Sequence, residues 1–251
     1  MLPAFSDPSA LATIALALLA GGMLKGALGL GAPVIAVPVL ASVFDVKLAV
    51  ALMVLPNLTS NLWQVRQFRA SQVPGRFPWV FAGAGALGAV LGTGLLIWLA
   101  SDTLKLILSA AVLAYVGLRL ARPGFILSPL RAGRLAAPVG LVGGMLQGAA
   151  GISAPASVSF LNAMQLARPV FISTISLFFA ATTAMQLPLL IAAGVMTPAV
   201  LVVGMLAGAP LFLGMRIGGR LVGAISPRAF DRMILVLLVG LAFKLAGDAL
   251  V

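Results

Sequence analysis

Two long apolar segments of this chain are interrupted by the same glycine-rich motif, and this duplication limits the folds open to it. The stretch from Gly21 to Pro33, GGMLKGALGLGAP, returns from Gly143 to Pro155 as GGMLQGAAGISAP. Nine of the thirteen positions are identical at a constant offset of 122 residues, close to half of the chain. Hydrophobic segments interrupted by Gly and Pro at matching places in two halves are typical of transporter binding sites.

The composition places the chain in a membrane. Hydrophobic residues make up 62% of it and charged residues only 8%. Cys and His are absent and all five acidic residues are Asp, so disulfide and thiol chemistry are excluded, and we expect no metal, no cofactor and no catalytic residues. The net charge of +11 comes from basic residues at the ends of apolar runs, which indicates membrane topology and not a nucleic-acid partner.

Each half divides into one interrupted segment followed by three ordinary membrane spans. In the first repeat, residues 1–121, the interrupted segment is 11–44 and the spans are 46–65, 77–99 and 103–121. After a cytoplasmic connector at 122–134, the second repeat, 135–251, has the interrupted segment 135–164 and the spans 169–192, 198–222 and 228–246.

The lengths of the interrupted segments predict re-entrant hairpins. A continuous helix over 11–44 would be about 50 Å long, whereas the apolar core of a bilayer is about 30 Å thick. The pieces after the break, 34–44 and 156–164, would be about 16 and 14 Å long and too short to cross. Because non-helical backbone at membrane depth must be buried in protein or line a wet cavity, the hairpin tips are expected in the protein interior.

The arginines predict the orientation of the two halves. With re-entrant hairpins each repeat crosses the membrane an odd number of times, so the repeats are inverted and all twelve arginines lie on one face. Parallel repeats would split the arginines seven to five. Because basic residues in short loops mark the cytoplasmic side, we expect an all-α polytopic protein of two inverted repeats with both termini outside the cytoplasm.

The duplicated motif resembles that of the TauE/SafE family of sulfite and organosulfonate exporters. The residues that carry the resemblance are Gly26, Gly29, Gly31, Pro33 and Pro38 in the first repeat and Gly148, Gly151 and Pro155 in the second. It covers nearly the whole chain, although Ala32 and Ser153-Ala154 replace the longer glycine runs of the family. The resemblance implies export of a small sulfur-containing anion, or a related carboxylate, across a bacterial inner membrane.

The hairpin tips are one candidate for the substrate site. Pro33 and Pro155 suit the first turn of the outgoing helices, whose free N–H groups and partial positive charge attract anions. Inverted symmetry would bring both tips together near the midplane. The candidate residues at the tips are Gly29, Gly31, Gly151 and Ser153. The alternative is that these glycines only allow close helix packing.

Lys25 is a second candidate, because an ionisable group deep in an apolar run is costly and usually functional. Its cation would attract an oxyanion, or its long side chain would snorkel to the interface. The equivalent position in the second repeat is the neutral Gln147, so a charge is not required by the fold.

A polar stripe on the span after each hairpin is the third candidate. One helical face carries Asn57, Ser60, Asn61 and Gln64. The second repeat has Thr182, Thr183 and Gln186 at the same offset, with Ser176 before them and Ser157, Ser159 and Asn162 as extensions. These neutral groups suit an anion that must also leave, although they would also serve as interhelical hydrogen bonds.

Three classes of function compete for this sequence. An anion transporter fits best, with a small anion and the lipid bilayer as partners; the oligomeric state is open, a homodimer being one option. An intramembrane enzyme is disfavoured because no His, Cys or carboxylate lies at the hairpins. A membrane assembly protein would not explain the duplicated interruptions. Because every Asp falls at a segment end, we expect efflux driven by the membrane potential and not by protons.

Overall fold

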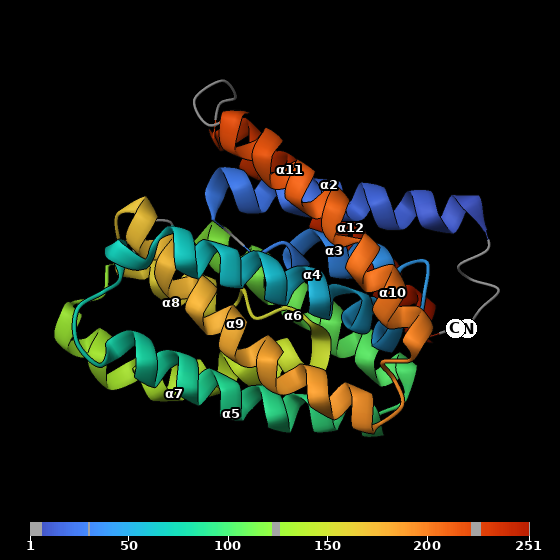
Figure 1. The fold of residues 1–251 in the computed structure, drawn as a ribbon, viewed down its shortest axis with the longest axis horizontal. Helices are drawn as coiled ribbons and strands as arrows, with labels where there is room; N and C mark the ends of the chain where they lie inside the picture. Colours follow the sequence, from blue (N-terminus) through green and yellow to red (C-terminus); the bar gives the residue numbers. More distant parts are fainter. Residues whose placement is uncertain (1–6, 30, 122–125, 222–226, 251) are drawn as a thin grey trace.

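The computed structural model describes residues 7–29, 31–121, 126–221 and 227–250, and these form helices with no strand (Figure 1). The first half contains α2 (Pro8–Leu28), α3 (Pro33–Ala41), α4 (Val46–Gln67), the 3₁₀ helix η1 (Arg69–Ser71), α5 (Phe77–Trp98) and α6 (Ser101–Ala121). The second half contains α7 (Pro129–Ala150), α8 (Ser157–Ala163), α9 (Arg168–Ala192), α10 (Pro198–Leu206), α11 (Gly208–Leu221) and α12 (Pro227–Leu250). Within the described ranges, six stretches are long and apolar enough to cross a membrane.

Both interrupted segments consist of a long and a short helical arm. The long arms, α2 and α7, have 21 and 22 residues, which makes them about 31 and 33 Å long. The short arms, α3 and α8, have 9 and 7 residues and reach only about 14 and 11 Å. Hence each long arm has the length of a full membrane span, whereas neither short arm does.

The start of each short arm differs between the halves. Pro33 begins α3, as the sequence predicts, because a proline in the first turn gives up no hydrogen bond. The second half departs from the prediction, since α8 begins at Ser157 and Pro155 lies in the preceding turn. There the N–H groups of Ala156 and Ser157 both donate to the carbonyl of Ser153, at 3.0 and 2.8 Å, and close a turn around the proline.

Two other helix boundaries also differ from the sequence-based division. The second long arm, α7, begins at Pro129, inside the stretch expected to be a connector. The span expected at 198–222 is interrupted at Ala207, between α10 and α11. Pro210 accounts for this break, because it has no N–H to donate to the carbonyl of Leu206 four residues earlier.

The helices are arranged in layers around a central pair (Figure 1). The pair consists of α4 and α9, which pack against each other between α2 and α11 on one side and α5 and α7 on the other. Glycines allow the outer pairs to approach closely. In α2, Gly22 and Gly26 face the backbone carbonyls of Leu211 and Met215; in α7, Gly144 and Gly148 face those of Gly85 and Ala89.

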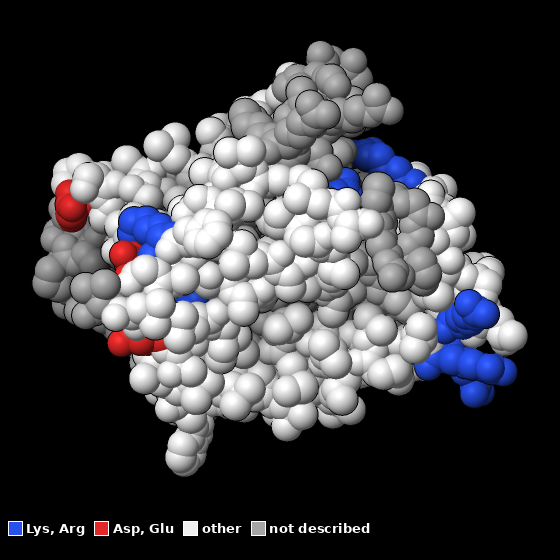
Figure 2. Space-filling view, turned by 180° about the vertical axis from the view of Figure 1, so that it is seen from behind, with Lys and Arg blue, Asp and Glu red and all other residues white. Residues whose placement is uncertain are grey.

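The charged side chains are divided between the two ends of the molecule. Figure 2 shows blue patches free of red at one end, whereas red and blue lie together at the other. The mixed end contains the ion pairs Lys105–Asp102 at 2.9 Å and Lys244–Asp248 at 2.8 Å. Lys47 also lies there, because its backbone N–H donates to Asp45 in the loop before α4. Since Lys25 is buried, the patches without red consist of arginines.

Candidate functional site

Lys25 lies in the interior of the protein although it is a basic residue. Only 1% of its surface is exposed. Its Nζ donates to Oγ of Ser60 at 2.9 Å and to Oδ1 of Asn61 at 2.7 Å, both on α4. Snorkelling, the alternative drawn from the sequence, would carry Nζ to an interface, and the structure does not show this. Both partners are neutral, so no carboxylate balances a positive charge at these contacts.

Hydrogen bonds extend from Lys25 across α4 to α9. Nδ2 of Asn61 donates to Oδ1 of Asn57 at 2.8 Å, and Nδ2 of Asn57 donates to Oγ1 of Thr183 at 3.2 Å. The Thr183 hydroxyl in turn donates to the carbonyl of Phe179 at 2.6 Å. We call the connected side chains the Lys25 network; they are Lys25, Ser60, Asn61, Asn57 and Thr183. The network therefore joins α2, α4 and α9 through five residues that the sequence singled out.

The remaining polar residues of the two stripes are buried but make separate contacts. Oε1 of Gln64 accepts from Oγ of Ser176 at 3.0 Å and joins α4 to α9. Nε2 of Gln186 donates to the carbonyl of Gly148 at 3.1 Å and joins α9 to α7. Thr182 bonds to a carbonyl of its own helix at 3.1 Å and is not part of the Lys25 network.

Gln147 has the position in the second half that Lys25 has in the first. It is 3% exposed, and its Oε1 has no hydrogen-bond partner among the described residues. With Asn57, Thr183 and Gln186 it lines a small cavity of about 10 Å³. Such a cavity has room for about one water molecule and not for a multi-atom anion. The position in the second half that corresponds to Lys25 is therefore polar and uncharged, and the cavity beside it is too small for the anion.

The structure places Gly29 and Gly151 at the C-terminal ends of the two long arms. Their N–H groups donate to the carbonyls four residues earlier, both at 2.9 Å, and so end α2 and α7. Both glycines are left-handed, with φ of 73° and 70°, a conformation that costs other residues about 1–2 kcal/mol. A methyl group on Gly29 would lie 2.6 Å from Ile172, and one on Gly151 3.1 Å from Val50. Side chains of α9 pack against Gly29, and side chains of α3 and α4 pack against Gly151, which also lines the small cavity beside Gln147.

The other tip residues also contact protein groups. A methyl group on Gly31 would lie 2.9 Å from the ring of Phe179 on α9. In the second half, Oγ of Ser153 and Oγ of Ser157 share a hydrogen bond of 2.7 Å. Ser159 donates to a carbonyl of the preceding turn at 3.3 Å. The tips thus lie against the central pair, and Ser159 and Asn162, which are only partly buried, lie further along α8.

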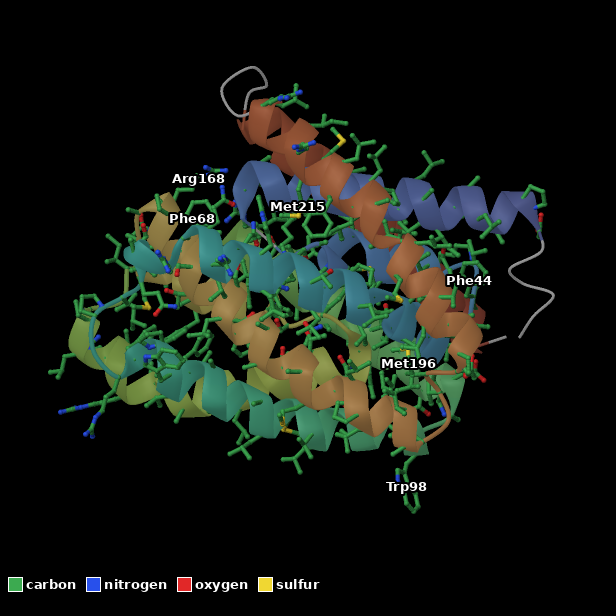
Figure 3. The ribbon with its side chains drawn as sticks, viewed as in Figure 1. Phe44, Phe68, Trp98, Arg168, Met196 and Met215 are labelled. Carbon is green, nitrogen blue, oxygen red and sulfur yellow. The ribbon has the colours of Figure 1, made fainter. Side chains whose placement is uncertain are left out.

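Two arginines that the sequence analysis treated only as topology determinants line a cleft near Lys25. The cleft has a volume of about 610 Å³ and is formed by residues of α2, α4, α9 and α11, with Arg168 and Arg216 among them. Nη2 of Arg168 donates to the carbonyl of Gly26 at 2.8 Å. Figure 3 shows Arg168, Phe68 and Met215 close to one another where these helices meet. This contact could not be predicted from the sequence, because Arg168 is 142 residues from Gly26.

The described buried polar side chains carry one lysine amine, several hydroxyls and several amides. No Asp is found among the described buried residues, and the described ranges contain no group of three metal-ligating side chains. Fold and site together define a multi-pass helical membrane protein with a polar interior built around one basic side chain.

The comparisons with known proteins assign this molecule to a family. The family model described as sulfite exporter TauE/SafE matches residues 13–245, nearly the whole chain. The protein therefore belongs to this family of membrane transporters, and the resemblance drawn from the duplicated motif is confirmed. Comparisons with curated proteins and with solved structures gave no match.

Proposed function

We propose that this protein exports a small oxyanion, sulfite or an organosulfonate such as sulfoacetate, from the cytoplasm of a bacterium across its inner membrane. The anion binds at the Lys25 network, between α2 and the central pair. One observation carries this proposal: the buried Nζ of Lys25 contacts Ser60 and Asn61, which are both neutral. Membership of a transporter family supports it independently.

The energetics of burial explain why an anion would bind there. A charged side chain at the centre of a membrane costs about 2.5–3.5 kcal/mol even on the most lenient scales, and such groups usually find a partner of opposite charge. An arriving oxyanion supplies that partner, and its oxygens accept the hydrogen bonds that Nζ otherwise gives to Ser60 and Asn61. The bonds to Ser60 and Asn61 are assisted by the charge of the donor alone, whereas a bond to an oxyanion also pairs the ammonium with an opposite charge, so the exchange favours binding.

The neutral members of the network then set how tightly the anion is held. The hydroxyl of Ser60 and the amide of Asn61 replace part of the hydration shell without adding charge, and Asn57 and Thr183 hold Asn61 in place through hydrogen bonds. A site with several cations would bind an anion firmly and release it slowly, whereas transport requires release. One lysine with neutral neighbours allows both binding and release. Because Gln147 is uncharged, the position that corresponds to Lys25 in the second half does not form a second strong anion site.

We further propose that the two halves are inverted repeats, each with a re-entrant hairpin beside the α4–α9 pair. Duplicated contacts support this arrangement. Gly29 contacts Ile172, and Gly151 contacts Val50. Gly29 and Gly151 are 122 positions apart in the sequence, and so are Val50 and Ile172. The end with arginines and no acidic patch is then cytoplasmic, and the termini lie outside.

The driving force in this proposal is the membrane potential. An anion that leaves the cytoplasm moves down the potential, which is worth about 2.3 kcal/mol per charge per 100 mV. This corresponds to roughly a 50-fold concentration ratio for each charge. The chain has no Glu or His, and no described Asp is buried in its interior, so a proton-carrying carboxylate or imidazole is not part of the proposal.

A transport screen tests the proposed function. Purified protein in proteoliposomes is offered sulfite, sulfoacetate, sulfolactate, sulfate and lactate, with protein-free liposomes as the control. We expect sulfite or a sulfonate to enter faster than sulfate or lactate and to compete with the other sulfonates. If none of the five anions moves faster than in protein-free liposomes, the proposal is wrong.

A further inference from the structure

The cleft at the arginine end is separate from the small cavity beside Gln147. Its volume of about 610 Å³ exceeds that cavity by far and is ample for a small anion with its water. The residues that line it come from four helices and are Gly26, Trp63, Gln64, Gln67, Phe68, Arg168, Ile172, Ala209, Phe212, Leu213, Met215, Arg216 and Gly219. Two of them are arginines and none is acidic, so the cleft presents positive charge only.

The cleft leads toward the Lys25 network. Gly26, which lines it, directly follows Lys25 in α2. Gln64, which also lines it, lies three residues after Asn61 on the same face of α4. The cleft walls therefore continue into the two helices that hold the buried ammonium.

The central pair opens at this cleft on its α11 side. Beside the cleft, Trp63 of α4 makes an edge-to-face contact with Phe212 of α11, with ring centroids 6.1 Å apart. By the sequence offset, α11 and α4 correspond to α5 and α9, where Gly85 of α5 packs directly against the ring of Phe178 of α9.

We propose that this cleft is the cytoplasmic entrance of the transport path and that Arg216 draws the anion into it, an inference that rests on the proposed function. Arg216 is exposed on α11, and its planar guanidinium carries five donors whose geometry suits oxyanions. Arg168 has a different part, because it donates to the carbonyl of Gly26 and holds the end of α2 against α9. Clefts lined by one sign of charge raise the local concentration of the oppositely charged ligand.

Charge-selective labelling tests the role of Arg216 without relying on transport. The chain has no Cys, so Gln67→Cys introduces a single thiol into the cleft lining. Its rates of reaction with an anionic and a cationic methanethiosulfonate are compared with and without Arg216→Gln. We expect the loss of Arg216 to lower the anionic rate about fivefold and raise the cationic rate about fivefold at low salt, the effect of one cation a few ångströms away in water, so that the ratio of the two rates falls about 25-fold. High salt should remove the difference.

Arg134→Gln is the matched control, because Arg134 belongs to α7, which contributes no residue to the cleft. It should leave the rate ratio unchanged. In proteoliposomes, Arg216→Gln should raise the KM for the anion several-fold with little change in kcat, and Arg134→Gln should not. An unchanged rate ratio or an unchanged KM in Arg216→Gln overturns the inference while the proposed function stands. Absence of any anion flux in the parent protein refutes the proposed function, and the entrance role with it.

Discussion

Replacing Lys25 by Gln is the most informative substitution in this protein. The change removes the only described buried charge and installs the amide that the second half has at the corresponding position, Gln147. The glutamine is shorter but keeps hydrogen-bonding groups for Ser60 and Asn61. The protein should therefore fold, and its affinity for the anion should fall.

The size of the effect follows from the contacts of Nζ. Hydrogen bonds to a charged group contribute about 1.5–3 kcal/mol each. If the anion loses one such bond, its KM should rise by about 10- to 150-fold, because 1.4 kcal/mol is a factor of ten. The free energy of unfolding should rise or stay the same, because removing a buried charge also removes its desolvation cost. In a protein of this size, a change of 1 kcal/mol in the free energy of unfolding shifts the melting temperature by up to about 4 °C.

Two measurements on the same preparation separate binding from folding. Sulfite flux into proteoliposomes is measured over a range of concentrations, and thermal unfolding is followed in detergent. Lys105→Gln is the matched control, because Lys105 forms a surface ion pair with Asp102 at 2.9 Å. Such pairs contribute about 0–1 kcal/mol, so this variant should transport and melt like the parent protein. A Lys25→Gln protein with the parental KM would show that the anion does not bind at Lys25.

Topology and the first hairpin provide two further tests. A single cysteine in place of Asp102 should react with an impermeant thiol reagent added outside the cell, and one in place of Arg76 should not; labelling at Arg76 would contradict the inverted arrangement. Gly29→Ala should destabilise the protein by about 1–3 kcal/mol more than Gly75→Ala, because both residues have positive φ but only a methyl on Gly29 meets a side chain, Ile172 at 2.6 Å. Equal melting temperatures for these two variants would refute that packing argument.

Much of the candidate site was accessible from the sequence because the pattern there is local. The stripe of Asn57, Ser60 and Asn61 follows from helical periodicity, and the depth of Lys25 follows from its place in an apolar run. The contact between Lys25 and this stripe could not be predicted, because a sequence pattern does not say which helix faces which. The contact between Nζ of Lys25 and Asn61 depends on how α2 packs against α4, and that is decided by tertiary structure.

The tip glycines show where the same reasoning fell short. The sequence places Gly29 and Gly151 among the candidate residues at the tips, and in the structure they end the long arms with positive φ and lie against neighbouring side chains. A glycine that permits close approach and a glycine that permits positive φ look alike in a sequence. Likewise Arg168 and Arg216 carry no local signal that separates them from arginines that only mark topology. Their position at a cleft depends on contacts between distant segments.

The central claim is that the protein carries an anion across the membrane down the electrical potential. Proteoliposomes loaded with sulfite and given an imposed potassium–valinomycin potential test this most directly. We expect sulfite to leave when the interior is negative, to be retained or taken up when the sign is reversed, and to move slowly when the potential is zero. Flux that ignores the potential and follows only an imposed pH gradient would contradict this account.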